Sequence, residues 1–304
     1  MGSGHDHSSA ALAAPRARLL AVLLISAAIL VVEVIGAYRS GSLALFADAG
    51  HMLTDVAGVA LALLAVTFAS RQASPERTFG YYRVEILAAV INAVLLFGVS
   101  IYLLIESWSR WNSPHEVDGG IVLIFASIGV VANLVSFFIL RGGAKDSLNV
   151  RGAYLEVLGD LLGSVTVIIA AVIIMATGWE RADALASAIV AIMMLPRTWS
   201  LLREAVDVLL EAAPRNVDVA EVRAHILEVD GVIEMHDLHI WTITSGQPVM
   251  SAHVVVSDET LADGAGGRVL DQLHECLAHH FDVDHCTFQI EGVGHAEHEA
   301  HGHP

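Results

Sequence analysis

Residues 44–69, ALFADAGHMLTDVAGVALALLAVTFA, form an apolar segment that is long enough to cross a membrane as a helix. The segment carries Asp48, His51 and Asp55 at positions i, i+3 and i+7, which lie on one face of a helix. Ionisable groups at membrane depth are costly and commonly mark a functional site. One histidine alone could be a packing residue, but three ionisable groups on one stripe predict a cation site or a proton relay.

Residues 153–177, AYLEVLGDLLGSVTVIIAAVIIMAT, repeat this pattern with Glu156 and Asp160 one helical turn apart. The small residues that follow, Gly163 and Ser164, allow two helices to approach closely. If the two polar faces meet, four potential ligands converge inside the membrane, namely His51, Asp55, Glu156 and Asp160. One imidazole and three carboxylates suit Zn²⁺ in tetrahedral geometry. Mn²⁺, Fe²⁺, Co²⁺ or Cd²⁺ would also be admitted, whereas a copper(I) site without thiolates is not expected.

The composition is that of a helical membrane protein, with 55% hydrophobic residues, 16% charged residues and a mean hydropathy of +0.62. Six segments are long enough to span the bilayer, at residues 18–38, 44–69, 84–108, 119–140, 153–177 and 182–202. The first continues past Glu33 without a small-residue cleavage site, so we expect a span and not a signal peptide. Pro196 is expected to kink the sixth span or to mark its exit from the membrane.

The distribution of Lys and Arg predicts the orientation of these spans. With the N-terminus inside, the outer flanks carry three basic residues, Arg39, Arg110 and Arg181. The inner flanks carry ten, which are Arg16, Arg18, Arg71, Arg77, Arg83, Arg141, Lys145, Arg151, Arg197 and Arg203. Both termini are therefore predicted to be cytoplasmic, in a multi-pass protein of the cell (inner) membrane.

The last 94 residues differ in character, because they hold 17 acidic and three basic residues and 12 of the 16 histidines. A basic surface for nucleic acid is absent from the sequence, and an acidic module fits cation handling, although solubility alone would also explain the acids. Hydrophobic patterning predicts a helix at 217–229, strands at 232–243 and 248–257, a helix at 259–281 and a strand at 285–291. This order, α-β-β-α-β, predicts a compact two-layer α/β domain.

The predicted organisation therefore has four parts. Residues 1–17 form a His-containing cytoplasmic N-terminal tail, 18–211 a six-helix transmembrane domain with a cytoplasmic linker, 212–292 a cytoplasmic metal-binding α/β domain, and 293–304 a His-rich disordered tail. Both His-rich ends have the composition of weak metal collectors.

Ligand-type residues also lie on the predicted strands of the tail. Simple alternation places His236 and His239 on opposite faces of a strand, so they are not expected to bind the same ion. His253 and Glu291 can join His236 if their strands are neighbours, which predicts a regulatory metal site; surface solvation is the alternative. The two cysteines, Cys276 and Cys286, are too few and too irregularly spaced for a disulfide framework or a Cys-type zinc site, and are expected to be packing residues.

Four further polar residues lie within the predicted spans: Glu33, Asn92, Asn133 and Asp183. Each is expected to form a hydrogen bond between packed helices. Glu33 and Asp183 could instead help to attract or pass cations.

Several stretches together resemble the cation diffusion facilitator family, especially its bacterial zinc, cadmium and cobalt exporters. They are GSLALFADAGHMLTD (41–55), RTFGYYRVEILAAVIN (77–92), RGAYLEVLGDLLGS (151–164), HDLHIWTITSG (236–246) and HCTFQIE (285–291). The match covers nearly the whole chain and the layout of six spans followed by a soluble domain.

The resemblance implies proton-coupled export of divalent metal from the cytoplasm by a homodimer, conferring metal tolerance, with the metal as substrate and regulator and no catalytic cofactor. It implies a transport site at His51, Asp55, Glu156 and Asp160. It also implies a metallochaperone-like (ferredoxin-like) cytoplasmic domain in which His236, His253 and Glu291 match family ligand positions.

The chain departs from the family pattern at Glu156, where the usual residue is His or Asp. The departure makes the site richer in oxygen and leaves the choice of metal open. The loop RQASPERTFGYY (71–82) has no histidine, so a loop site found in some members is not expected here. Arg83 and Glu211 match positions that form a charge interlock near the cytoplasmic membrane face in some members.

Two other classes of function are weighed against transport. A membrane metal sensor would bind ions with its acidic tail and use the spans only as an anchor, but an anchor needs no ligands at membrane depth. An intramembrane metalloenzyme would need an open coordination position and a separate general base, and no H-E-x-x-H pattern is present in the sequence. The sequence therefore favours a transporter that is not an enzyme.

Overall fold

The computed structural model describes residues 7–69, 74–141, 148–244, 247–262, 264–280 and 285–296. Of the predicted tails, residues 1–6 and 297–304 lie outside the described residues. A long helix begins at His7, and a short helix covers Val293–Ala296, so these four residues are not disordered as the sequence predicted. Contacts divide the chain into two compact units. The first contains the chain up to Leu64 together with Ala88–Leu202, and the second contains Ala65–Leu87 together with the chain from Arg203 onward.

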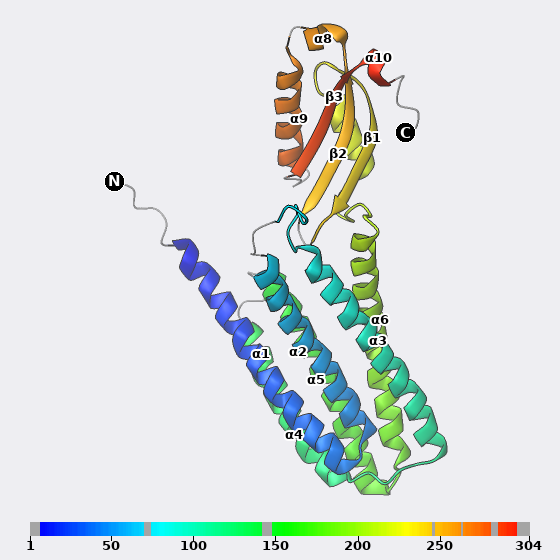
Figure 1. The fold of residues 1–304 in the computed structure, drawn as a ribbon. Helices are drawn as coiled ribbons and strands as arrows, with labels where there is room; N and C mark the ends of the chain where they lie inside the picture. Colours follow the sequence, from blue (N-terminus) through cyan, green and yellow to red (C-terminus); the bar gives the residue numbers. More distant parts are fainter. Residues whose placement is uncertain are drawn as a thin grey trace. The chain divides into compact units, whose positions relative to one another are not determined.

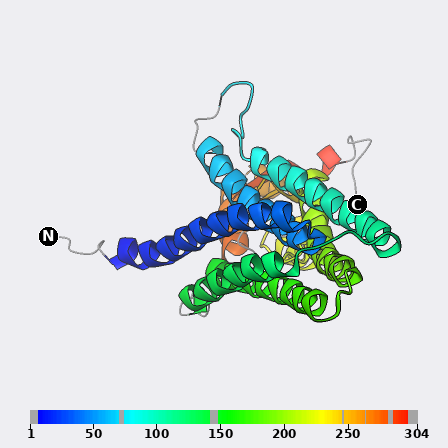
Figure 2. The ribbon, with the colours of Figure 1, turned by 90° about the horizontal axis from the view of Figure 1, so that it is seen from below.

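Six long helices precede the small domain, and their ribbons are shown from two directions in Figures 1 and 2. They are α1 (His7–Ser40), α2 (Leu43–Ala69), α3 (Arg83–Asn112), α4 (Gly119–Arg141), α5 (Leu148–Thr177) and α6 (Arg181–Leu209). Over the described residues, all of them except α2 are long and apolar enough to cross a membrane. Side chains of α2 are described only as far as Gly58, so its status as a span stays a prediction. The helix α6 continues through Pro196 for several turns, so this proline does not end it.

The bundle has small residues where its helices meet. The helix α4 packs against both α1 and α5. One apolar cluster joins five helices and consists mainly of alanine: Ala37, Ala44, Leu45, Val122, Ala126, Val167, Ala170, Ala171, Ile174, Ala182 and Ala186. A second cluster joins α2, α3 and α6 through Leu43, Ala47, Leu96, Leu103, Val190, Ala191 and Met194. Small side chains let helix backbones approach closely, so these clusters bring the polar faces of α2 and α5 within reach of each other.

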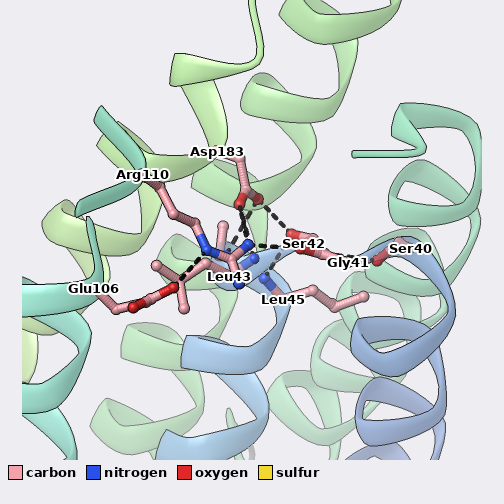
Figure 3. A network of polar contacts seen from close by, with 9 residues as sticks. Ser40, Gly41, Ser42, Leu43, Leu45, Glu106, Arg110 and Asp183 are labelled. Carbon is pink, nitrogen blue, oxygen red and sulfur yellow. Dashed lines mark hydrogen bonds and ion pairs between the residues drawn. The ribbon is translucent and has the colours of Figure 1, made fainter. Parts of the chain in front are cut away.

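The start of α2 is held by a carboxylate from another helix (Figure 3). Asp183, in the first turn of α6, accepts hydrogen bonds from the backbone N–H groups of Leu43 at 2.7 Å and Ala44 at 3.2 Å. It also accepts one from the Ser42 hydroxyl. The first N–H groups of a helix have no partner within the helix, and a carboxylate placed there satisfies them and suits the helix dipole. The hydrogen bonds expected of Asp183 are therefore present, and they fix where α2 begins.

Arg110 of α3 extends this network (Figure 3). Its guanidinium donates to the carbonyl of Gly41 at 2.7 Å and to Glu106 at 3.0 Å, and lies 3.9 Å from Asp183. Gly41 has a φ of +70°, a conformation that glycine adopts at little cost, and it makes the turn between α1 and α2. Three helices are thus tied to the first turn of α2.

The second unit contains the small α/β domain, in which three strands form one sheet. Its elements are α7 (Val219–Leu227), β1 (Val232–Thr242), β2 (Pro248–Val256), α8 (Asp258–Ala262), α9 (Gly266–His280), β3 (His285–Gly292) and α10 (Val293–Ala296). The sheet order is β1-β2-β3, with β1 antiparallel and β3 parallel to β2 (Figure 1). The predicted order α-β-β-α-β is confirmed, except that the predicted helix at 259–281 is two helices, α8 and α9. The glycine-rich stretch between them includes Gly264 at a φ of +68°, which interrupts the helix.

One face of the sheet forms the core of this domain. The core is formed by residues of α7, by alternate residues of β2 and by residues of α9: Val222, Ile226, Met250, Ala252, Val254, Val256, Val269, Leu273 and Leu277. Asp218 caps α7 by accepting hydrogen bonds from two backbone N–H groups of its first turn. Because the residues at alternate positions of a strand point to opposite faces, His253 lies on the face away from this core.

Candidate metal centres

The polar faces of α2 and α5 meet as the sequence predicts. The Nε2 atom of His51 lies 3.2 Å from Asp160 Oδ1 and 3.7 Å from Asp55 Oδ2. One ligand atom from each of these three residues falls within 4.8 Å of the other two. Asp160 is buried, and the side chains of His51 and Asp55 are 12% and 17% exposed. An imidazole and two carboxylates at this spacing could bind one divalent cation.

Asp48 lies about one helical turn before His51 on α2 and supports the same site. It is 1% exposed and accepts a hydrogen bond of 2.8 Å from the Ser164 hydroxyl of α5. A side chain at Gly163 would place its Cβ 3.1 Å from Asp48 Oδ1, so glycine makes room for this contact. The two small residues noted in the sequence therefore join α5 to the polar stripe of α2.

A cavity of about 130 Å³ opens beside the cluster between α2, α5 and α6. Its wall is made by Asp48, His51, Leu155, Glu156, Gly159, Gly163, Val190, Met193, Met194 and Arg197. A water molecule occupies roughly 30 Å³ of liquid volume. The cavity can therefore hold a cation together with some of its water ligands.

Glu156, the fourth predicted ligand, lines this cavity but is engaged by a cation of the protein itself. The Nη2 atom of Arg197, on α6, forms an ion pair with Glu156 Oε1 and lies 3.6 Å from Asp55 Oδ1. Within the described residues, Glu156 is not among the ligand atoms grouped with His51. Three of the four predicted ligands thus come together directly, and the fourth lies beside them, paired with Arg197.

Arg197 is the residue of this site that the sequence reasoning missed. It was counted among the flanking charges that set orientation. The sequence feature that could have identified Arg197 is its position inside the predicted sixth span, because an arginine there needs an acidic partner or access to water.

Glu33 and Asn133 do not form the packing hydrogen bonds expected of them. Both are almost fully buried, and their side chains have no hydrogen-bond partner among the described residues. The glycine at position 129 of α4 leaves space for Glu33, because a Cβ there would lie 2.5 Å from Glu33 Oε1. Asn92 approaches Gly58 of α2, where a Cβ would lie 3.1 Å from its Nδ2 atom.

A second group of potential ligands lies on the sheet of the α/β domain. His236 of β1 is paired directly with His253 of β2, and their ring centroids are 5.0 Å apart. Glu291 of β3 lies 2.5 Å from His236 Nε2 and 3.8 Å from His253 Nδ1. One ligand atom from each of the three falls within 4.8 Å of the others. Glu291 is buried and accepts a hydrogen bond from Gln289 at 3.1 Å, which orients its carboxylate.

The expectation that His236 and His239 lie on opposite faces is wrong. His236 pairs with His253 and His239 pairs with Ser251, so three steps along β1 match two along β2. A β-bulge takes up the extra residue, and Asp237 within it has a φ of +49°. Both histidines therefore lie on the face away from the core, although His239 is outside the group of ligand atoms described above.

The remaining sequence predictions fall outside these two centres. Arg83 and Glu211 form an ion pair of 2.7 Å in the second unit, with both side chains well exposed. Cys276 and Cys286 are unbonded to each other. Burial, and then the charge of Glu228, raise the pKa of the Cys276 thiol above its ordinary value, which disfavours the thiolate that metals require.

Comparison with known proteins agrees with both halves of this structure. Residues 19–210 match the family model of the cation efflux transmembrane domain, and residues 214–293 match that of the cation efflux protein cytoplasmic domain. The metal cation efflux system protein CzcD of Cupriavidus metallidurans is 45% identical over 291 residues, which are 96% of this chain and 90% of that protein.

Two further relatives cover similar shares. The zinc transporter ZitB of Escherichia coli is 42% identical over 96% of this chain and 93% of its own length. The cadmium, cobalt and zinc/H(+)-K(+) antiporter of Bacillus subtilis is 39% identical over 99% of this chain and 94% of its own length. With both domains matched and its apolar helices in place, the chain belongs to the cation efflux, or cation diffusion facilitator, family of membrane metal transporters.

Proposed function

We propose that this protein exports divalent metal cations, Zn²⁺ first among them, from the cytoplasm across the cell membrane in exchange for protons. The observation that carries the proposal is the cluster of His51, Asp55 and Asp160 on apolar helices, with ligand atoms within 4.8 Å of one another. An anchor for a sensor domain needs no such ligands at membrane depth. The names of the relatives, which include zinc, cadmium and cobalt transport, support the class of substrate.

The proposed substrate site has Glu156 as its fourth ligand beside the three clustered residues. All four ligands come from α2 and α5, and the cavity gives space for the ion and some of its waters. Carboxylates and imidazole bind metal in their deprotonated forms, so metal binding releases protons and protons arriving from the other side displace the metal. Exchange of one for the other follows when the site faces the two sides of the membrane alternately.

The proposal includes the arrangement of the chain in the membrane. Residues 18–211 are taken as the transmembrane domain with both termini cytoplasmic, 212–292 as the cytoplasmic domain, and 1–17 and 293–304 as tails. The functional unit is taken as a homodimer. A transporter of this kind performs no covalent chemistry on its substrate, so we assign no enzymatic activity.

We assign the cluster of His236, His253 and Glu291 a regulatory role, in which cytoplasmic metal occupies the sheet. Two histidines and one carboxylate are a common zinc set that leaves a fourth position open. The strands hold these three ligands rigidly. The fraction of protein with metal bound here therefore follows the cytoplasmic metal concentration, and the bound ion does not have to be passed on.

Metal uptake by sealed proteoliposomes tests the proposal. With the lumen acidic and Zn²⁺ added outside, wild-type protein in the cytoplasmic-side-out orientation is expected to accumulate zinc inside. Accumulation should be accompanied by a rise of the lumenal pH, and a protonophore should collapse both. Binding of zinc without any accumulation would favour the sensor function and contradict transport.

A further inference from the structure

We propose that Arg197 is a tethered cation of the transport site, which neutralises Glu156 and Asp55 in the metal-free protein and is displaced when the divalent cation binds. The proposal rests on the function proposed above, and it assigns to one residue the control of metal affinity at that site.

The geometry places one guanidinium nitrogen against carboxylates of two different helices. The Nη2 atom of Arg197 on α6 pairs with Glu156 of α5 and lies 3.6 Å from Asp55 of α2. The other two members of the site, His51 and Asp160, contact each other at 3.2 Å. The four ligands are therefore divided into His51 and Asp160, which contact each other, and Glu156 and Asp55, which lie next to Arg197.

Formal charge explains why such a residue is needed. Three ionised carboxylates carry a charge of −3, whereas a single divalent cation supplies only +2. Arg197 reduces this charge to −2 in the metal-free site, and it leaves when the divalent cation, which supplies the larger charge, takes its place. Unpaired charges are expensive in apolar surroundings, such as the part of the cavity wall that is formed by Leu155, Val190, Met193 and Met194.

The guanidinium and the metal compete because they use the same two carboxylate groups, those of Glu156 and Asp55. Carboxylate oxygens that accept hydrogen bonds from Arg197 cannot at the same time donate fully to a metal ion. Arginine also keeps its charge at any pH the protein meets, so it cannot leave the site by losing a proton. It can leave only by a movement of its side chain or of α6.

A merely structural role makes a different prediction. If Arg197 only ties α6 to α5, its removal lowers stability or the maximal transport rate but leaves the affinity of the site for metal unchanged. Its effect then would not depend on the charge of Glu156. The two roles are separated by measuring affinity and rate independently.

The full chain in nanodiscs serves for affinity, with Zn²⁺ titrated against a fluorescent chelator, and proteoliposomes serve for rate. To keep the sheet cluster from contributing, both measurements are made in a Glu291→Gln background. Removing a competing charge of this kind is expected to change affinity at least about fivefold, the lower end of ordinary coupling between sites. Arg197→Gln should therefore lower the Kd for zinc at least about fivefold and lower the maximal uptake rate, because the metal is released more slowly.

The role of Glu156 is tested by combining variants. In a Glu156→Gln background, Arg197→Gln should change the Kd by less than half of its fold-change in the parent, because the main partner of the arginine is gone. Arg203→Gln, an exposed arginine further along α6, is the matched control and should leave both Kd and rate unchanged. A Kd within twofold of the parent for Arg197→Gln, or an equal fold-change in both backgrounds, would overturn the proposal.

A measurement on the unmodified chain keeps the test independent of whether these variants fold. Phenylglyoxal reacts with accessible arginines, and mass spectrometry reports the reaction at each one. Zinc is expected to raise the modification of Arg197 several-fold and to leave that of Arg203 unchanged. Zinc that leaves Arg197 unaffected or protects it contradicts displacement, whereas a wild-type protein that moves no zinc contradicts the proposed function itself.

Discussion

The two clusters of potential ligands use similar chemical groups on very different scaffolds. The ligands of the membrane cluster come from α2 and α5 and consist of one imidazole and two carboxylates. Arg197 of α6 lies beside them. The sheet cluster has two imidazoles and one carboxylate from three hydrogen-bonded strands, with His236 and His253 directly paired. The ion pairs described for Glu291 in the sheet cluster are with histidines and not with an arginine.

This difference teaches what each scaffold allows. Neighbouring strands share a ladder of hydrogen bonds, so the ligands on them cannot separate without breaking the sheet. Helices satisfy their backbone groups internally and can shift against one another, which a carrier that alternates between two sides requires. The membrane cluster therefore suits an ion that must leave, and the sheet cluster suits an ion that stays.

The largest effect is expected where the membrane scaffold is fixed at the start of α2. In Asp183→Ala, two backbone N–H groups and the Ser42 hydroxyl lose their acceptor, and Arg110 loses a nearby carboxylate. Removing one partner of a buried charged network costs about 3–5 kcal/mol. Thermal unfolding of the detergent-solubilised protein should show a marked drop in Tm, together with loss of zinc uptake.

Asp183→Asn is the matched variant for that prediction. It keeps one acceptor oxygen and should recover part of the lost stability. An unchanged Tm in Asp183→Ala would contradict the view that this carboxylate positions α2.

The sheet cluster gives the next effect. Glu291→Gln removes the only carboxylate of that cluster's ligand set. It should weaken zinc binding there by at least about tenfold, because losing even a residue that only orients a metal ligand has an effect of this size. Because the ions that cross the membrane do not pass through this site in our account, uptake at saturating zinc should persist. Equilibrium dialysis measures binding, with Glu275→Gln on α9 as the control; unweakened binding in Glu291→Gln would break the assignment.

The next effect concerns which metal ion the membrane cluster prefers. Glu156→His replaces an oxygen ligand by nitrogen, which favours Zn²⁺ and Co²⁺ over Mn²⁺. The ratio of zinc to manganese flux should rise by about tenfold, equivalent to roughly 1.4 kcal/mol. A flux panel over Zn²⁺, Cd²⁺, Co²⁺, Fe²⁺ and Mn²⁺ checks this, and an unchanged ratio of zinc to manganese flux argues against Glu156 as a ligand.

The smallest effect is expected at the cap of α7. Asp218→Ala removes a local acceptor from two N–H groups and should cost the small domain about 1 kcal/mol. Chemical denaturation followed by the fluorescence of Trp241 reports this loss, while zinc uptake should stay at the wild-type rate. Asp218→Asn should restore the stability, because asparagine caps helices equally well. A loss of zinc uptake in either variant would contradict our view that the stability of the small domain and transport by the membrane cluster are independent here.

Much of the fold was predictable because its signals are local. The apolar spans follow from hydropathy, and the position of Glu156 and Asp160 on one face follows from helix periodicity. The succession of helices and strands along the small domain follows from alternation and turns. The meeting of His51 with Asp160 was predictable because ionisable groups at membrane depth need partners.

The features that were missed depend on contacts distant in sequence or on local irregularities. Arg197 contacts a residue 41 positions earlier, and no periodicity of the sequence predicts this contact. The capping of α2 by Asp183 is likewise a contact between helices far apart in the chain. The bulge at Asp237 shifts one strand by a residue, and it reverses the face on which His239 lies.

The central claim is that the membrane cluster carries the substrate. Zinc uptake by proteoliposomes containing Asp160→Ala tests it most directly, with Glu116→Ala, an exposed carboxylate in the loop before α4, as the control. The account predicts that Asp160→Ala folds, assembles and transports no zinc above protein-free vesicles, while Glu116→Ala transports at the wild-type rate. Wild-type uptake by Asp160→Ala would contradict the account.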